Sequence, residues 1–382
     1  MNNRSVGIIT YHHYYNYGTM LQAYALQKEI ELLGYQSELI DFKQNNNPTT
    51  IELLAIRIKR LPVYLREFKK YHTLDSSKEM ISKRIQAYEE FYSKYLKVGN
   101  QRYTSSKEIK ENPPLYDGYV VGSDQTWNPY VAKNPEAFYL SFVDDNKKKG
   151  SYAPSLAVSR LSDEQRNMFR ERLNGFSYIS CRESSGAKLL EETLGCQVKT
   201  VLDPTLLLDS KTWKEISSDN PETEPYILTY FLGDVKAHRV FVHRLADITG
   251  LKVIAIPVSY LDINDSISDN RWVGPDQFLS LISHAEYVCT DSFHGTMFSI
   301  NFGVKFYVFC KTKDTEQSSE NSRLYNALEL FGLSARLVDD KNEEDILKTL
   351  PEINYEKVNK TLKEKREESI AYLTDMLKAI TE

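Results

Sequence analysis

The stretch VGIITYHHYYNYGTMLQAYALQKEIELLGYQSELIDF, residues 6–42, decides the fold class. Residues 6–10 are a short apolar, β-branched run, and residues 36–42 have the pattern of a second strand. Between them apolar residues recur at helical spacing, and Gly34 ends that pattern. A strand, a helix and a strand in this order form a βαβ unit, which favours a parallel sheet covered by helices.

The same alternation continues along the chain. In the first half, further strand-like runs lie at residues 118–121, 150–153, 178–182 and 199–202. In the second half they lie at residues 226–231, 252–257, 287–290, 305–309 and 335–338. Between the two series, residues 209–225 lapse into charged and turn residues, which marks a domain boundary.

These patterns predict an α/β protein with two Rossmann-like, doubly wound domains that face a cleft. The first domain spans residues 1–210 and carries a helical insertion at about residues 48–112. The second spans residues 222–350. A long charged helix at residues 355–382 is expected to pack back onto the first domain. Ligands of such sheets gather beyond the carboxyl ends of the strands, so residues directly after strands are the candidates for a site.

Composition restricts the function classes. A length of 382 residues suggests two or three domains at roughly 150 residues each, and two fits the pattern better. The net charge of -5 argues against nucleic acid as a partner. No apolar run has the ~18–20 residues of a membrane span, so we expect a cytoplasmic protein. The four cysteines are scattered and form no close pair, and no metal site is expected.

His294 lies in the segment DSFHGT, residues 291–296, which follows a strand-like run and begins a helix. Asp291 and Ser292 are good N-cap residues, and Gly295 removes a side chain where a ligand could approach, so free backbone N–H groups could face an anion. A histidine at such a strand-to-helix elbow can serve as a general acid or base. The alternative is a histidine that only hydrogen-bonds the elbow.

Several cations follow strand-like runs. Arg182 closes one of them, where a guanidinium could hold a phosphate or carboxylate bidentately, although a salt bridge to Glu183 is the simpler alternative. Lys311, Lys313 and Arg323 lie in a polar stretch after residues 305–309 and are further candidates for binding an anionic substrate. A solvated loop is an equally good interpretation of each.

Two loops carry hydrogen-bonding groups. In GSDQTWNP, residues 122–129, Trp127 could stack on a sugar ring, with Asp124 as acceptor or base; an Asx-turn with a buried tryptophan is the alternative. In NYGT, residues 16–19, Gly18 permits a tight turn and Thr19 could cap a helix. Neither a Gly-x-Gly-x-x-Gly motif nor a Walker lysine is present, so a dinucleotide or P-loop nucleotide has weak support.

The insertion contains an apolar face within residues 51–61 that is flanked by basic residues. Such a helix could lie on a membrane that holds a lipid-linked substrate. More often such a stretch is a helix that packs by one face and leaves its charges solvated.

Four segments, NYGTMLQAYALQ (residues 16–27), GSDQTWNP (122–129), DPT (203–205) and DSFHGT (291–296), together resemble the polysaccharide pyruvyl transferase family over about residues 6–333. The resemblance implies a GT-B-like fold and transfer of a pyruvyl group from phosphoenolpyruvate to a sugar, without a further cofactor. The product would be a pyruvate ketal on a cell-surface polysaccharide or its lipid-linked precursor. The protein would then act in the cytoplasm, with the inner face of the membrane as an option.

The resemblance also assigns roles. His294 matches the family's histidine at the donor, where we expect it to donate a proton, and Asp124 is the candidate for acceptor activation. Arg182 matches an arginine that holds phosphoenolpyruvate. We expect the donor to be contacted by Arg182 and by residues of the second domain, namely Ser292, Gly295, Thr296, Lys311, Lys313 and Arg323. Expected acceptor contacts, from the first domain, are Asn16, Gly18, Ser123, Gln125, Trp127 and Asn128.

One departure bears on the donor. Family members often have Arg-Leu-His where this chain has Ser292-Phe293-His294, so one expected positive charge is missing. A GT-B glycosyltransferase that uses a nucleotide sugar is the main alternative, with Asp276 or Glu286 as a ribose ligand. A non-catalytic sugar-binding protein is a third.

Overall fold

The computed structural model describes residues 4–43, 78–131, 136–220, 222–311 and 321–382. It contains two five-stranded parallel sheets. The order of the first is β3 (Val98–Tyr103), β2 (Gln36–Phe42), β1 (Ser5–Ile9), β4 (Gly118–Val121) and β5 (Lys149–Ser151). The order of the second is β10 (Ser268–Asn270), β9 (Lys252–Ala255), β8 (Tyr226–Tyr230), β11 (Tyr287–Thr290) and β12 (Lys305–Val308). A short parallel pair, β6 (Ser180–Cys181) and β7 (Lys199–Thr200), continues the first sheet through a bridge between Tyr178 and Gly150.

In both sheets the strand order reverses in the middle. The reversal falls between β1 and β4 in the first sheet and between β8 and β11 in the second. Such a switch point leaves a crevice beyond the carboxyl ends of the two strands, because the connections run to opposite sides. The loops that follow these four strands are therefore the ones that build the site.

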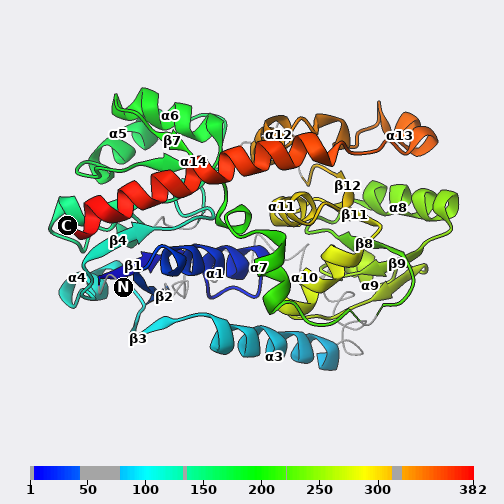
Figure 1. Ribbon diagram of the computed structural model, residues 1–382, viewed down its shortest axis with the longest axis horizontal. Coiled ribbons are helices and arrows are strands. Elements are labelled where there is room, and N and C mark those ends of the chain that lie inside the picture. Colours follow the sequence, from blue (N-terminus) through cyan, green and yellow to red (C-terminus); the bar gives the residue numbers. More distant parts are fainter. Residues whose placement is uncertain (1–3, 44–77, 132–135, 221, 312–320) are drawn as a thin grey trace, which may run out of the picture.

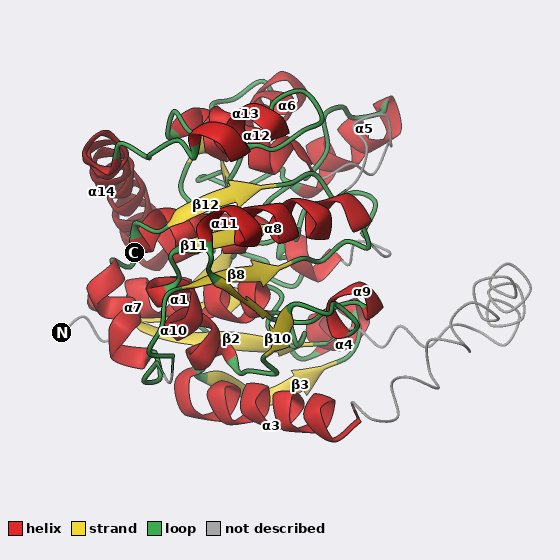
Figure 2. Cartoon of the chain, turned by 90° about the vertical axis from the view of Figure 1, so that its right-hand side faces the viewer, coloured by secondary structure: helices red, strands yellow, loops and turns green. Residues whose placement is uncertain are grey.

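Helices surround the strands (Figures 1 and 2). They are α1 (Tyr17–Leu32), α3 (Lys78–Tyr95), α4 (Ser106–Glu111), α5 (Asp163–Arg172), α6 (Ser184–Leu194), α7 (Ser210–Ile216), α8 (Lys236–Thr249), α9 (Tyr260–Ile263), α10 (Pro275–His284), α11 (Phe293–Phe302), α12 (Asn321–Leu330), α13 (Glu343–Thr349) and α14 (Tyr355–Thr381). The described residues also include short 3₁₀ turns, labelled η, of which η4 (Pro204–Leu206) and η5 (Ser334–Arg336) matter below.

Helix α1 joins the two domains. Asn16 caps it, since its side-chain oxygen accepts the N–H of Thr19 at 3.1 Å. The helix is buried on nearly all sides because it packs against α10, α11 and η4 as well as its own sheet. Tyr17 stacks on Phe278 of the second domain with ring centroids 4.2 Å apart. One hydrophobic core thus runs through both domains and fixes the cleft between them.

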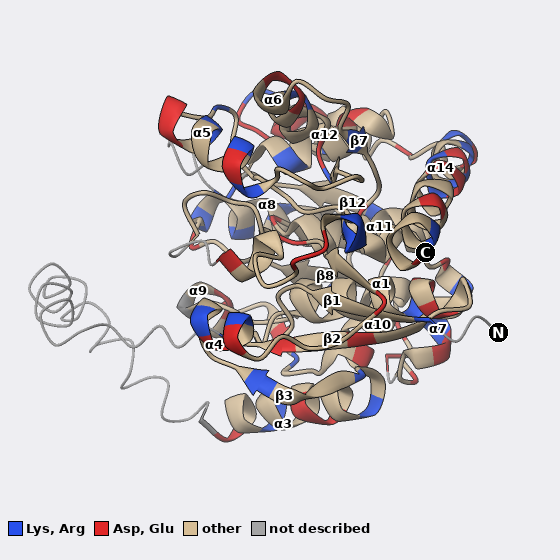
Figure 3. Cartoon of the chain, turned by 90° about the vertical axis from the view of Figure 1, so that its left-hand side faces the viewer, with Lys and Arg blue, Asp and Glu red and all other residues tan. Residues whose placement is uncertain are grey.

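Helix α14 returns across the molecule to the first domain (Figure 1). Its Arg366 donates to the carbonyl of Leu206 at 2.6 Å and to Asn301 on α11 at 3.2 Å. Near the end of α14, Ile380 lies where a Cβ at Gly118 would stand, and Met376 lies where a Cβ at Gly150 would stand. Glycine at these positions in β4 and β5 therefore lets the helix pack closely on the sheet. Acidic and basic residues alternate along its exposed side (Figure 3).

Two sequence expectations need correction. Residues 335–338 are not a strand: η5 is a 3₁₀ turn, and only Leu337 forms a single bridge to Val308. The insertion at residues 48–112 is not wholly helical, because β3 is an edge strand of the first sheet. The amphipathic stretch at residues 51–61 lies outside the described residues. Among the helices that are described, none is long and apolar enough to cross a membrane.

Candidate active site

The loops after β1, β4, β8 and β11 enclose a cavity of about 300 Å³ between the domains. The first domain contributes Tyr11, Tyr14, Asn16, Asp124 and Gln125 to its wall. The second domain contributes Asp291, Ser292, His294, Lys311 and Arg323. The expected acceptor and donor residues of these two lists therefore face one space.

His294 projects from the first turn of α11 toward the first domain. Ser292 is the N-cap of this helix, and its hydroxyl accepts the N–H of Gly295 at 3.3 Å. The imidazole lies against Gly18 at the start of α1, where an added Cβ would stand 2.0 Å from Nδ1. Gly18 is therefore needed for close approach of the two domains at the imidazole, not only for a turn.

A buried carboxylate connects the imidazole with Arg182. Asp203 Oδ2 lies 2.7 Å from Nη1 of Arg182 and 3.5 Å from Nε2 of His294, and it accepts the hydroxyl of Ser123 at 3.1 Å. Although burial opposes ionisation, the neighbouring His294 and Arg182 hold the pKa of Asp203 well below its usual range. Asp203 is thus a fixed negative charge that orients Arg182 and lies beside the imidazole of His294. It precedes η4, which places it beyond the carboxyl end of β7.

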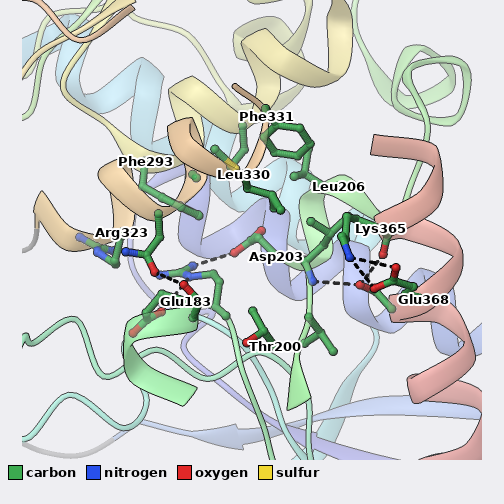
Figure 4. A pocket seen from close by; sticks show the side chains of 18 residues that line it. Glu183, Thr200, Asp203, Leu206, Phe293, Arg323, Leu330, Phe331, Lys365 and Glu368 are labelled. Carbon is green, nitrogen blue, oxygen red and sulfur yellow. Dashed lines mark hydrogen bonds and ion pairs between the residues drawn. The ribbon is translucent and has the colours of Figure 1, made fainter. Parts of the chain in front are cut away.

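Arg182 lines a second cavity of about 210 Å³, which shares Phe293 and Arg323 with the first. Its Nε and Nη2 atoms have no hydrogen-bond partner among the described residues, so two donors remain for a ligand. Figure 4 shows Asp203 at the centre of this cavity, with Leu330 and Phe331 above it and Arg323 to one side. The partner of Arg182 at short range is Asp203, whereas Glu183 lies 4.0 Å away.

Phe293 stands between the two cavities, and two guanidinium groups lie over its ring. Arg182 is 4.2 Å and Arg323 is 5.8 Å from the ring centroid. Both Phe293 and Arg323 line both cavities. Arg323 therefore brings a positive charge to the elbow where the family's arginine is replaced by Ser292. Lys311 lines the first cavity, and Lys313 lies outside the described residues.

Asp124 is held in an unusual backbone conformation. Its φ is +68°, a left-handed value that is rare outside glycine and is often found at functional sites. One carboxylate oxygen accepts the hydroxyl of Thr19 at 2.8 Å and the other accepts the N–H of Gln125 at 2.9 Å. Burial, then the charge of Asp124, raises the pKa of the adjacent Tyr11.

Trp127 is not a sugar-stacking face, contrary to the sequence prediction. The side chain is fully buried, its Nε1 donates to the carbonyl of Phe138 at 3.0 Å, and its ring stacks parallel to Tyr139. The loop turns the indole inward, so it belongs to the core. The aromatic rings that do line the cavity are Tyr11 and Tyr14, and Tyr14 is 56% exposed.

Other expected contacts are used within the protein. Ser123 is fully buried and bonded to Asp203, and Thr296 is fully buried and donates to the carbonyl of Ser292. Asn128 donates to the side chain of Gln125 at 2.6 Å and shapes the loop. Direct ligand contacts from the side chains of Ser123, Thr296 and Asn128 are therefore not supported, because none of them lines either cavity.

The sequence prediction gave no role to Asp203 or to Tyr11 and Tyr14. Asp203 directly follows the strand-like run 199–202, the same position that singled out Arg182 and His294. That position was the available signal. Tyr11 directly follows the strand-like run 6–10 and carried the same signal, whereas nothing local distinguishes Tyr14 among the 26 tyrosines.

The fold and the cavity place the chain in a class, that of two-domain GT-B-like proteins. A glycosyltransferase from Rickettsia africae is 9% identical, with 99% of this chain and 97% of that chain covered at a TM-score of 0.50. The N-terminal domain of Candida albicans trehalose-6-phosphate phosphatase is 11% identical, with 98% and 99% covered at the same TM-score. A comparison with curated protein sequences gave no match.

The model of one family, polysaccharide pyruvyl transferase, matches residues 16–309. The chain belongs to the polysaccharide pyruvyl transferase family, which implies a saccharide acceptor.

Proposed function

We propose that the protein transfers a pyruvyl group from phosphoenolpyruvate to a sugar of a cell-surface polysaccharide or its lipid-linked precursor, and forms a pyruvate ketal. The observation that carries this proposal is the buried Asp203 that joins Arg182 to His294 beside the interdomain cavity. Arg182, Arg323 and Lys311 supply the positive charge that a donor with a phosphate and a carboxylate requires.

The chemistry uses a proton donor next to these cations. His294 protonates the methylene carbon of phosphoenolpyruvate, which makes the adjacent carbon electrophilic. An acceptor hydroxyl adds to that carbon and loses its proton, inorganic phosphate leaves, and a second hydroxyl of the same sugar closes the ketal. The carboxylate of Asp203 lies 3.5 Å from His294 Nε2 and supplies a negative charge beside the imidazole during the transfer.

The acceptor side of the cavity belongs to the first domain. Asp124 is the candidate for binding or activating the hydroxyl, and Asn16 and Gln125 are candidates for holding the sugar. Tyr11 and Tyr14 take over the aromatic role that Trp127 cannot perform. A lipid-linked acceptor would bring the protein to the inner face of the membrane.

A nucleotide-sugar glycosyltransferase is less well supported. It needs an acidic residue for the ribose, and neither Asp276 nor Glu286 lines either cavity. Asp291 lines the first cavity, but its two carboxylate oxygens already accept the N–H groups of Leu232 and Gly233. Glu286 instead pairs with Lys305 at 3.2 Å.

Ligand-dependent thermal stability separates the two donors. At 100 times its dissociation constant, the true donor should add ~2.7 kcal/mol to the free energy of unfolding. We expect phosphoenolpyruvate to raise the melting temperature and UDP-sugars to leave it unchanged. Stabilisation by UDP-sugars alone would rule out the pyruvyl donor.

Substitution of the central residues tests the mechanism. His294→Ala should abolish phosphate release from phosphoenolpyruvate while leaving the circular dichroism spectrum intact, and His284→Ala, on α10 outside both cavities, is the matched control. Arg182→Lys should weaken phosphoenolpyruvate binding, because an ammonium keeps the charge but cannot offer the free Nε and Nη2 donors. An active His294→Ala protein, or an Arg182→Lys protein with unchanged donor affinity, would contradict the assignment.

A further inference from the structure

Two histidines and an aspartate meet at the carboxyl ends of neighbouring strands, away from the His294 cavity. His12 and His13 follow β1, and Asp41 lies near the end of β2, which pairs with β1. Their potential ligand atoms all lie within 4.8 Å of one another. None of the three residues lines either of the cavities described above. The cluster is therefore separate from the proposed donor and acceptor sites.

His12 presents an unused lone pair inside the protein. Its Nδ1 lies 3.0 Å from the carbonyl of Thr10, and because a carbonyl only accepts, Nδ1 carries the hydrogen. Nε2 is then an acceptor, and it is fully buried without a hydrogen-bond partner among the described residues. A ring whose other nitrogen donates to a backbone carbonyl is the usual arrangement of a metal-binding histidine.

His13, the next residue in the chain, provides the second imidazole of the cluster. Its Nε2 lies 2.8 Å from Oδ1 of Asp41, yet the pair lacks hydrogen-bond geometry. Two imidazoles and a carboxylate thus converge within reach of one cation.

Arg102 is the group that competes for the carboxylate. Its Nε lies 3.2 Å from Oδ1 and 3.0 Å from Oδ2 of Asp41. The arginine side chain is 60% exposed, whereas that of Asp41 is 11% exposed. Because the guanidinium is exposed, it can turn to solvent when a doubly charged cation takes its place beside the Asp41 carboxylate.

We infer that His12 Nε2, His13 Nε2 and a carboxylate oxygen of Asp41 bind a divalent transition metal of the zinc type, with water as the fourth ligand. Two imidazole nitrogens disfavour calcium and magnesium, which prefer oxygen ligands. Metal–ligand bonds of about 2.0–2.2 Å place tetrahedral ligand atoms about 3.3 Å apart. Ligand atoms that are up to 4.8 Å apart must therefore close by at most about 1.5 Å, whereas His13 Nε2 and Asp41 Oδ1, 2.8 Å apart, must separate slightly.

The position of the cluster gives the metal a structural role. The segment between β1 and α1 carries Tyr11, Tyr14 and Asn16 into the interdomain cavity. A metal held by His12, His13 and Asp41 would tie this segment to β2. It would thereby fix the wall of the cavity that belongs to the first domain, without touching the reacting atoms.

Cobalt and zinc binding to the full-length protein test the inference. The protein is treated with a chelator, dialysed, and titrated with Co²⁺ and then Zn²⁺, while visible absorption and calorimetry are recorded. We expect one equivalent per chain, the d–d bands of four-coordinate Co²⁺, and loss of these bands when Zn²⁺ displaces it. A chain without a stoichiometric site or these bands would overturn the inference.

Variants identify the ligands. His13→Gln and Asp41→Asn should each weaken Zn²⁺ binding at least tenfold and abolish the cobalt spectrum, with circular dichroism unchanged. His12→Gln should do the same, and if it fails to fold, the other two variants still decide the question. His243→Ala is the matched control, because His243 lies 2.6 Å from Asp265 in another histidine–carboxylate pair. Equal losses in the control, or unchanged binding in all three cluster variants, would refute the site.

Discussion

Replacing Gly18 by alanine is the sharpest test of how the two domains build the site. The new Cβ would stand 2.0 Å from Nδ1 and 2.3 Å from Cγ of His294, whereas ordinary contact begins at 3.4 Å. The imidazole must therefore move by about 1.4 Å, the difference between 3.4 and 2.0 Å. Misplacement of a catalytic group by about 1 Å costs about 100-fold in rate, or about 2.7 kcal/mol of transition-state stabilisation.

Folding should be affected much less than catalysis. Position 18 lies in the first turn of α1, and alanine is favoured over glycine in a helix by up to about 1 kcal/mol, which offsets part of the clash. We expect kcat/KM for phosphate release from phosphoenolpyruvate to fall at least 100-fold, with a melting temperature within a few degrees of wild type. Gly99→Ala is the control, because the nearest atom to its added Cβ would be the Tyr116 hydroxyl oxygen at 3.2 Å. Turnover within a few-fold of wild type, or an unmoved imidazole in a crystal structure of Gly18→Ala, would refute the reasoning.

Three further predictions concern the buried network. The pKa of Asp203 is lowered in the folded protein, so the stability it contributes is present above its unfolded pKa of about 3.9 and is lost as the pH falls toward the folded value. In urea unfolding below about pH 4, Asp203→Asn should therefore lose stability less steeply with falling pH than wild type, and parallel curves would contradict this. Trp127→Phe should cost about 1–3 kcal/mol of stability, because a buried carbonyl loses its donor, and should leave the KM of the acceptor unchanged; a raised KM would restore a role in sugar binding. Arg366→Ala should lower the free energy of unfolding by about 1–3 kcal/mol, since the Leu206 carbonyl loses its donor, whereas Lys360→Ala on the exposed side of the same helix should have no effect in the same denaturation assay.

The sequence alone determined the alternation of strands and helices. Strands β2, β4 and β11 begin and end at the predicted residues. A strand inside a buried parallel sheet needs a short run of apolar residues, and such a run is visible in the local sequence. The prediction failed where local pattern is weak. Strand β3 is a largely polar edge strand with only one fully buried residue, and the apolar residues near 335–338 serve a turn against β12.

The positions of Arg182 and His294 after strands were also visible in the sequence, but their partnership was not. Only the packing of α1, α11 and η4 brings Asp203 between them and places Gly18 against the imidazole. The same holds for Trp127, whose loop composition suits a core or a binding site equally well. Hydrophobic periodicity specifies which face of an element is buried, whereas contacts between distant segments depend on how the domains dock. The sequence thus determined the central strands and the loops that follow them but neither edge strand β3 nor β10, and the tertiary structure decided which of the loop residues form the site.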